Sequence, residues 1–259
     1  MKPDAKPPSP AHAPHGPLTD YYESEQHRQA YLREIFDNTA PDYDRIEAML
    51  AWGTGPRYRR EALVRAGLTP GMRVLDVGVG TGLVAAQACR LTGDPALVTG
   101  IDPSPGMMAA SHLPKTMKLI EGRAESLPFP DNHFDFLSMG YALRHISDLG
   151  VAFTEFERVL KPGGRLCILE ISQAKSPVGR WLLKNYMRGV IPLLTHFISK
   201  QKRSATMWRY FWDTIEACVP PEQVLATLSA TGLTQVKRHL VIGIFSEYQA
   251  IKAGPTPNN

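Results

Sequence analysis

The sequence predicts an α/β fold in which a seven-stranded, mostly parallel sheet carries helices on both faces. Between residues 70 and 172, short apolar runs of strand length alternate with helical segments, the pattern of a doubly wound parallel sheet. Pro162-Gly163-Gly164 ends a helix and leads into a strand, which is the turn chemistry of such a fold. The chain has 259 residues, 43% of them apolar, which is enough for one domain with a large core.

The N-terminal part of the chain lies outside this alternation. Residues 1–20 hold six prolines and too few apolar residues to order themselves, so we expect a disordered tail there. Residues 21–66 have helical apolar spacing with a break at 52–56, which predicts two helices before the sheet. We expect a single domain over residues 21–254 and a flexible C-terminus at 255–259.

The strands are expected in the order of the apolar runs. Helical segments follow the first, second and fourth runs, a helical insertion at 173–217 follows the fifth, and a helix at 221–231 precedes the sixth. The seven runs are MRVLDVG, ALVTGID, MKLIEG, FDFLSMGYAL, GRLCILEIS, VKRHLVI and FSEYQAI. The chain therefore predicts five strands, a helical insertion and two closing strands.

Charge and cysteine content exclude several function classes. The net charge is +4, but residues 173–212 hold eight basic and no acidic residues, so the rest of the chain sums to −4. The chain has no arginine-rich tract, and SMGYALRHI stands where base-amino methyltransferases carry Asn/Asp-Pro-Pro-Tyr/Phe, so we expect no nucleic-acid partner. Cys89, Cys167 and Cys218 lack metal-type spacing, which predicts no metal site. Without a long apolar run or a signal peptide, the chain is expected to be cytoplasmic.

A glycine-rich turn follows the first strand, where an open parallel sheet binds its ligand. The turn carries Gly78, Gly80 and Gly82, but Leu83 stands where a dinucleotide fingerprint has its third glycine. Asp76 precedes the turn by two residues, and a carboxylate there repels a pyrophosphate and attracts an ammonium group. The turn therefore favours a cationic ligand over a dinucleotide, unless its glycines serve only for tight packing.

A second carboxylate completes this pattern. Asp102 ends the second predicted strand, 20 residues after Gly82, where a carboxylate accepts hydrogen bonds from both hydroxyls of a ribose. The cofactor that joins an adenosine to a cationic amino acid is S-adenosylmethionine. The sequence therefore predicts methyl transfer rather than hydride transfer.

Several blocks of the chain resemble a known family. VLDVGVGTG, GID, LPFPDNHFD and RVLKPGGRLCILE resemble class I S-adenosylmethionine-dependent methyltransferases. FDNTAPDYDRIEAML, YALRHISD, LEIS, YFWDTI and LVIGIFSEYQAIKA resemble, more narrowly, the ubiquinone/menaquinone biosynthesis C-methyltransferase family. The resemblance covers about residues 31–252. It implies a Rossmann-like class I methyltransferase fold, with S-adenosyl-L-homocysteine as the product of the cofactor.

The resemblance also implies a cofactor site. Its glycines would approach the methionine part, Asp102 the ribose, and the residues before LPFP the adenine. Where the family commonly has an aspartate after Gly122, this chain has Arg123, which cannot accept a hydrogen bond from adenine but can stack on the ring. The expected cofactor-binding residues are Asp76, Gly78, Gly80, Gly82, Asp102, Pro103, Met107, Arg123, Ala124, Glu125 and Met139.

Three residues after the fourth strand are the expected catalytic residues. Where the family usually reads Phe-Gly-Leu-Arg-Asn, this chain has Tyr141-Ala142-Leu143-Arg144-His145. We expect His145 to act as a base toward a phenol and Arg144 to stabilise the phenolate, while Tyr141 lines the acceptor cavity. The alternative for His145 is a purely structural hydrogen bond. Tyr43 and Asp44, in the helical N-terminal part, either fold over the cofactor or belong to core and surface.

The insertion suggests a membrane contact. Within 178–198, every fourth residue from Arg180 is basic: Arg180, Lys184 and Arg188. On a helix these three residues form a basic stripe among large apolar residues. The interpretations are a peripheral contact of residues 173–212 with an anionic bilayer, or a solvated face whose apolar side packs on the sheet. The sequence indicates no oligomeric state.

Three functions remain open at this point. The first is C-methylation of a small aromatic or lipid-like acceptor, a quinol or phenol of quinone biosynthesis. The second is C-, N- or O-methylation of a specialised metabolite or a phospholipid amine, which the changes at Arg123 and His145 favour. The third is a non-catalytic partner protein that binds the cofactor, against which the intact glycine turn argues.

Overall fold

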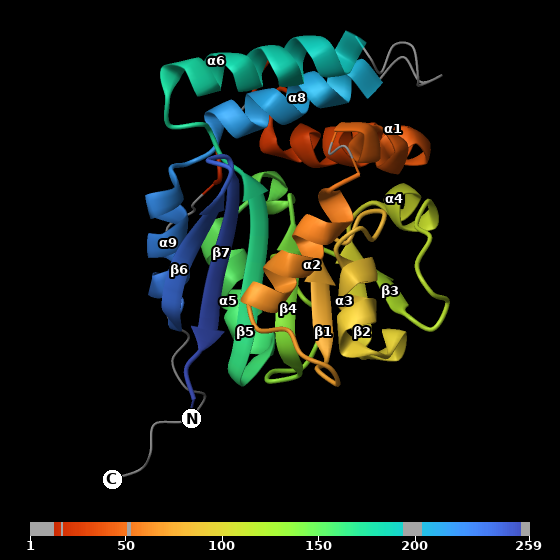
Figure 1. Cartoon of the computed structure of the whole chain (residues 1–259), viewed down its shortest axis with the longest axis vertical. Helices are drawn as coiled ribbons and strands as arrows, with labels where there is room; N and C mark the ends of the chain where they lie inside the picture. The colour runs from red at the N-terminus through yellow and green to blue at the C-terminus, as the bar shows by residue number, and fades with distance from the viewer. Residues whose placement is uncertain (1–12, 17, 51–52, 194–203, 255–259) are drawn as a thin grey trace.

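The computed structural model describes residues 13–16, 18–50, 53–193 and 204–254, which form a layered α/β structure (Figure 1). Its centre is a seven-stranded sheet in the order β3-β2-β1-β4-β5-β7-β6. The strands are β1 (Val74–Val77), β2 (Val98–Asp102), β3 (Lys118–Glu121), β4 (Phe134–Gly140), β5 (Leu160–Ile171), β6 (Leu233–Val241) and β7 (Phe245–Lys252). The pairs among the first five strands are parallel, and only β7 runs antiparallel, between β5 and β6. The predicted mostly parallel sheet is confirmed.

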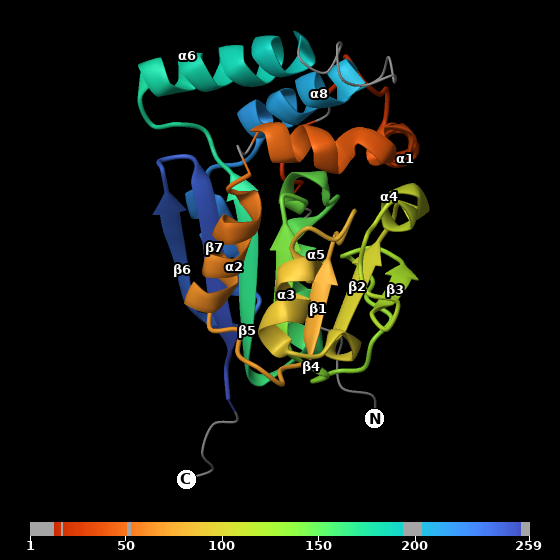
Figure 2. The same cartoon turned by 45° about the vertical axis from the view of Figure 1, so that its right-hand side comes forward.

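Helices cover both faces of the sheet (Figure 2). On one face lie α2 (Gly55–Arg65) and α3 (Ala85–Thr92), and their side chains share an apolar cluster with Val74 and Phe136. On the other face lie α5 (Leu149–Val159) and α9 (Pro221–Ala230), which share a second cluster with β4 and β5. Strands buried on both faces read as continuous apolar runs, which is why the sequence located them.

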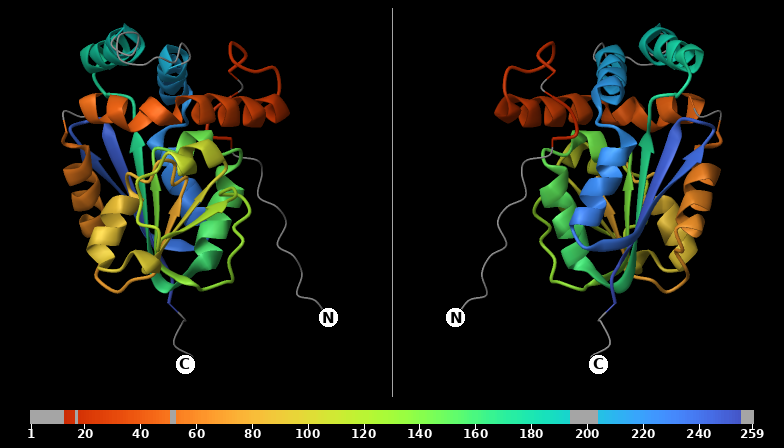
Figure 3. Two further views of the ribbon diagram at one scale, coloured as in Figure 1. Left: turned by 90° about the vertical axis from the view of Figure 1, so that its right-hand side faces the viewer. Right: turned by 90° about the vertical axis from the view of Figure 1, so that its left-hand side faces the viewer.

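A third layer of helices lies across the end of the sheet at which the parallel strands finish (Figures 1 and 3). We call this layer the helical cap; it consists of α1 (Glu25–Leu50), α6 (Pro177–Asn185), the π-helical η3 (Tyr186–Val190) and α8 (Ser204–Ala217). Its own core joins residues of α1, η3 and α8, including Ile35, Met187 and Trp212. Arg28 anchors α1 to the layer below by donating from Nη2 to the carbonyl oxygens of Arg144 and Ile146, at 3.2 and 3.1 Å.

The remaining helices are short and lie in the loops at both ends of the strands. They are η1 (Pro95–Leu97), α4 (Pro105–Ala109) and η2 (Leu143–His145). Ser104 caps α4 by accepting a hydrogen bond from the Met107 N–H at 3.1 Å. This cap fixes the backbone directly after β2, beside the end of β1.

The N-terminal segment differs from the expected tail at its end. The prediction of disorder over 1–20 includes residues 1–12 and 17, which lie outside the described residues. Pro14 accepts a hydrogen bond from the Val219 N–H at 2.7 Å, and the His15 side chain is buried. Pro14 and His15 therefore pack against the domain, because the loop before α9 offers a backbone donor that no sequence pattern reveals. The predicted C-terminus at 255–259 also lies outside the described residues.

Candidate active site

A cavity lies between the carboxyl ends of β1, β2 and β4 and the underside of the helical cap. Its floor is the turn after β1, and its walls come from the loops after β2, β3 and β4. Leu32, Phe36 and Tyr43 of α1 and Phe211 of α8 close it from above. The position is the one at which open parallel sheets bind ligands.

The turn at residues 78–82, which we call the glycine loop, approaches the cavity with its backbone. Gly78 and Gly80 line the cavity with positive φ of 68° and 53°. A Cβ on Gly78 would lie 2.6 Å from the Ala142 Cβ, and one on Gly80 would lie 3.3 Å from the Met107 Cε. Gly82 does not line the cavity; a Cβ there would meet Leu113 at 2.5 Å. Gly82 therefore packs closely against Leu113, and its expected contact with the cofactor stays a prediction.

Two buried carboxylates lie at the ends of β1 and β2. Asp76 accepts a hydrogen bond from the Ser138 Oγ at 2.6 Å, and burial raises its pKa to about 7. Asp102 accepts one from the Gly80 N–H at 2.7 Å and one from the Ser104 N–H at 2.8 Å, and burial raises its pKa to about 6. Desolvation disfavours the charged form, so each carboxylate gains from a cationic or hydrogen-donating ligand.

The expected adenine end forms a third part of the cavity. Pro103, Met107, Ala124 and Met139 line it together with Arg123 and Glu125. Arg123 Nη2 donates to the Ser147 Oγ at 3.0 Å and pairs with Glu125 at 3.2 Å. Glu125 in turn accepts from the Ser147 N–H at 2.6 Å. The guanidinium is thus held in place by two partners at this end of the cavity.

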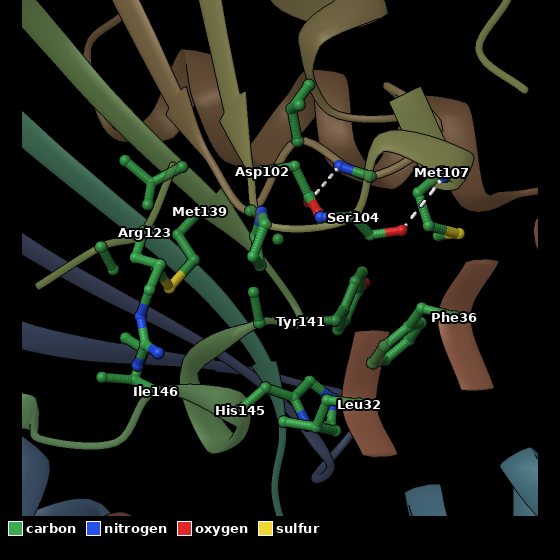
Figure 4. Close-up of a pocket in the computed structure, with 18 of the residues that line it drawn as sticks. Leu32, Phe36, Asp102, Ser104, Met107, Arg123, Met139, Tyr141, His145 and Ile146 are labelled. Atoms are coloured by element: carbon green, nitrogen blue, oxygen red, sulfur yellow. Dashed lines mark hydrogen bonds between the residues drawn. The ribbon is translucent and has the colours of Figure 1, made fainter. Parts of the chain in front are cut away.

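Tyr141 and His145 lie on the cavity side that faces α1, close to Leu32 and Phe36 (Figure 4). The Tyr141 backbone has a φ of 60°, which is rare for a bulky residue and is characteristic of functional sites. The His145 ring lies edge-on to Phe36 and Phe211, at 5.3 and 5.7 Å between centroids. Neither of its nitrogens has a hydrogen-bond partner among the described residues. Burial, then the charges of Arg144 and Arg28, lower the His145 pKa well below its usual value, so the ring is neutral at pH 7.

Arg144 does not line the cavity, contrary to the expectation that it stabilises a phenolate directly. Its side chain is fully buried and forms an ion pair with Glu170 of β5. Its Nε donates to the Thr214 Oγ1 of α8 at 3.0 Å, and its guanidinium lies 4.8 Å from the Phe211 ring centroid. The acidic partner draws the guanidinium away from the cavity, so Arg144 supports the cavity wall from behind.

Helix α1 contacts the cofactor side of the cavity through two aspartates, of which only Asp44 was singled out from the sequence. Asp37 Oδ1 accepts from the Ser104 Oγ at 2.5 Å and from the Gly106 N–H at 2.9 Å. Asp44 accepts from the Thr81 Oγ1 at 2.5 Å, which brings α1 over the glycine loop. Asp37 and Asp44 are seven residues apart and so share one helix face. The seven-residue spacing was the only signal in the sequence for this contact. It does not distinguish two aspartates that bind the loops below α1 from two aspartates on a solvent-exposed helix face.

Comparison with known proteins places the chain in a family. The ubiE/COQ5 methyltransferase family model matches residues 24–252. The chain belongs to this family. It is 32% identical to a demethylmenaquinone methyltransferase of Symbiobacterium thermophilum, over 85% of this chain and 91% of the relative. It is 31% identical to a ubiquinone/menaquinone biosynthesis C-methyltransferase of Geotalea daltonii, over 85% of this chain and 96% of the relative.

The solved structures agree on the fold. A methyltransferase of Thermotoga maritima, described as a possible histamine N-methyltransferase, has a TM-score of 0.56 and 21% identity. The match covers 85% of this chain and 99% of that one. The class I methyltransferase fold that the sequence predicts is therefore confirmed.

This family member is an S-adenosylmethionine-dependent methyltransferase, as the sequence predicted. The residues present fit that cofactor, because two glycines with blocked Cβ positions and two buried carboxylates line one cavity. Among the described residues, no group of three or more His, Cys, Asp or Glu is arranged to hold a metal ion. None of the described helices has the length and apolar character needed to cross a membrane.

Proposed function

We propose that this protein methylates a ring carbon of a reduced quinone precursor. The observation that carries the proposal is the cavity wall made by Phe36, His145 and Phe211, which we call the acceptor wall. It offers flat apolar surface around one neutral imidazole whose nitrogens have no partner among the described residues. A hydroxylated aromatic ring matches that surface, and relatives of the chain are named for menaquinone and ubiquinone biosynthesis.

The opposite side of the cavity is the proposed cofactor site. Each Asp102 oxygen accepts one backbone hydrogen bond and keeps a lone pair for a ribose hydroxyl. Asp76 faces the ammonium group, and its carboxylate regains its charge when that cation binds. Arg123 and Glu125 border the adenine, with Met139 beside them. When bound, S-adenosylmethionine supplies a methyl group made electrophilic by a sulfonium.

The acceptor wall orients the nucleophile. A ring carbon of a hydroquinone becomes nucleophilic as its hydroxyl loses a proton, and a neutral imidazole accepts a hydrogen bond from that hydroxyl. Because burial and two arginines lower the His145 pKa, the imidazole is neutral across the physiological range. We assign to His145 the alignment of the hydroxyl and receipt of its proton, and to Arg144 the support of Phe211. Tyr141 borders the acceptor.

The test supplies methyl-labelled cofactor, purified protein and a panel of demethylated hydroquinones, phenols and phospholipid amines. Product is analysed by mass spectrometry, with fragmentation to locate the label. Label on a hydroquinone ring carbon is the expected result. Label on an amine nitrogen or a hydroxyl oxygen, or transfer only to non-quinol acceptors, contradicts the proposal. Binding without transfer to any acceptor identifies a cofactor-binding partner protein instead.

We propose in addition a peripheral contact with a membrane, made by α6. Its Val178, Trp181 and Leu182 side chains are 68%, 63% and 56% exposed. Ile242, in the β6–β7 turn, is 83% exposed, and the turn and α6 line one shallow depression. Large apolar side chains exposed together on a helix insert into the interfacial region of a bilayer. An acceptor with a prenyl tail resides in that bilayer.

The charge of α6 contributes less than the sequence suggests. Lys184 and Arg188 of the basic stripe pair with Glu216 and Asp213 of α8, at 3.4 and 3.6 Å. We therefore expect binding to sedimented phosphatidylcholine vesicles to strengthen only modestly with phosphatidylglycerol. Trp181→Ser with Leu182→Ser should abolish binding, whereas Val64→Ser, an exposed valine on α2, should not. Equal binding by both variants, or no binding by the unmodified protein, contradicts this contact.

A further inference from the structure

Arg59 is a buried cation at the edge of the cavity. Its side chain, on α2, is 3% exposed and lines the cavity. Nη2 donates to the Glu47 Oε1 at 2.5 Å. Nε and Nη1 have no hydrogen-bond partner among the described residues. Buried donors without an acceptor are costly, and more so on a charged group, so this arrangement indicates a ligand that accepts hydrogen bonds.

The neighbours of Arg59 place it at the glycine-loop end of the cavity. Its guanidinium carbon lies 5.6 Å from the centroid of the Tyr141 ring. The next residue, Ala142, is the one that a Cβ on Gly78 would meet at 2.6 Å. α2 begins near the end of the sheet at which β1 finishes (Figure 2). Arg59 thus lies at the end of the cavity where the methionine part would bind, whereas Arg123 and Glu125 line the end where the adenine would bind.

We propose that Arg59 binds the carboxylate of the cofactor's amino-acid part, a role that rests on the proposed cofactor site. The amino-acid part of the cofactor is a zwitterion. Arg59 would pair with its carboxylate, and Asp76 would pair with its ammonium group. The carboxylate accepts a charge-assisted hydrogen bond from Nε or Nη1, the two nitrogens without a partner among the described residues, and Glu47 holds Nη2 in position. The chain thereby selects an intact amino acid and not merely a nucleoside with a positively charged tail.

The experiment compares two ligands by isothermal titration calorimetry. One is S-adenosylhomocysteine, and the other is its decarboxylated analogue, S-adenosyl-3-thiopropylamine, which keeps the adenosine, the thioether and the amine. The unmodified protein should bind the first about 10- to 100-fold more tightly, the range that hydrogen bonds to charged groups give. Equal affinities for the two ligands overturn the proposal without requiring any variant.

Variants then locate the selectivity. Arg59→Gln should weaken binding of S-adenosylhomocysteine about 10- to 100-fold and leave the decarboxylated analogue within about twofold. Gln retains a hydrogen bond to Glu47, and Arg59→Lys, which keeps the charge, should restore part of the affinity. Arg60→Gln, at the exposed neighbouring position, is the matched control and should change neither affinity.

Three results contradict the assignment. Equal weakening of both ligands by Arg59→Gln means that Arg59 only supports the fold. No weakening of either means that its free donors face another ligand, such as an acceptor anion. Failure of the unmodified protein to bind either ligand refutes the cofactor site itself, and so separates that failure from a wrong role for Arg59. None of these readouts depends on identifying the methyl acceptor.

Discussion

The glycine loop and the acceptor wall face each other across one cavity, but they are fixed in different ways. The loop is held by backbone hydrogen bonds to the end of β2, such as the one from the Gly78 N–H to the Ile101 carbonyl oxygen at 2.8 Å. The acceptor wall is held by side chains from distant segments: Phe36 comes from α1, His145 from η2 and Phe211 from α8. One wall is therefore mostly backbone, and the other is almost entirely side chain.

This difference separates two properties of the enzyme. A backbone wall tolerates changes of neighbouring side chains, so binding of a common cofactor persists while the sequence around it varies. A side-chain wall changes shape and chemistry with each substitution, as the family's usual asparagine becoming His145 illustrates. Substitutions in the acceptor wall should therefore alter the methyl acceptor or the rate, and substitutions in the glycine loop should alter cofactor affinity.

Substitution of His145 should produce the largest effect. His145→Ala should lower kcat about 10³-fold, within the range for loss of a positioned acid–base group, and leave S-adenosylhomocysteine affinity within about twofold. Steady-state kinetics of label transfer to the hydroquinone measure the first effect, and calorimetry measures the second. His145→Asn, which can accept a hydrogen bond but not a proton, should lie between. A kcat unchanged in both variants would show that the imidazole only fills space.

Removal of the negative charge of Glu170, which lies behind the acceptor wall, should have the second largest effect. Glu170→Gln leaves the Arg144 guanidinium buried without its anion and should lower the free energy of unfolding by about 3 kcal/mol in urea titration. Glu61→Gln removes the partner of the exposed Arg57 and should leave the free energy of unfolding nearly unchanged, because solvent screens that pair. Similar losses in the two variants would mean that Arg144–Glu170 does not organise this wall.

The same contrast explains how far the sequence predicted the molecule. The sheet and the glycine loop follow from local patterns, because a strand's apolar run and a turn's glycines depend on neighbours in the chain. The close packing of Gly82 was not predicted, because its contact is Leu113, about thirty residues on. Arg144 was misjudged for the same reason, since its acidic partner is on β5. Arg59 was not considered, because a buried arginine and a solvated one look alike in a helical pattern.

Two glycines with positive φ allow a matched test of the loop. Gly78→Ala should weaken S-adenosylhomocysteine about 10- to 100-fold, because its Cβ would lie 2.6 Å from the Ala142 Cβ and the loop must move away. Gly71 has a φ of 80° but no atom within 4 Å of its Cβ position. Gly71→Ala should therefore cost a similar backbone strain and leave affinity within about twofold. Equal loss of affinity in both variants would attribute the effect to strain alone.

The smallest effect expected is a pH dependence confined to the cofactor side. Burial raises the Asp76 pKa to about 7, so this carboxylate is increasingly protonated below pH 7 and loses its attraction for the ammonium group. Affinity for S-adenosylhomocysteine should fall about tenfold between pH 8 and pH 6, and Asp76→Asn should bind weakly with a nearly flat profile.

The free energy of unfolding should depend on pH in the opposite direction to the cofactor affinity. A carboxylate whose pKa is raised from 3.8 on folding binds more protons when folded, so the ligand-free protein loses its contribution as pH rises from about 4 to about 7. Asp102, whose pKa is raised to about 6, acts in the same direction. Urea titrations of the ligand-free protein at pH 5 and pH 7.5, set beside Asp76→Asn, measure this contribution. An affinity profile as steep in Asp76→Asn as in the unmodified protein would instead assign the titration to another group. Opposite slopes for stability and affinity, with Asp76→Asn flattening the affinity profile and leaving only the Asp102 part of the stability slope, would show that the cofactor side holds the Asp76 carboxylate at a cost to folding which the ammonium group offsets on binding.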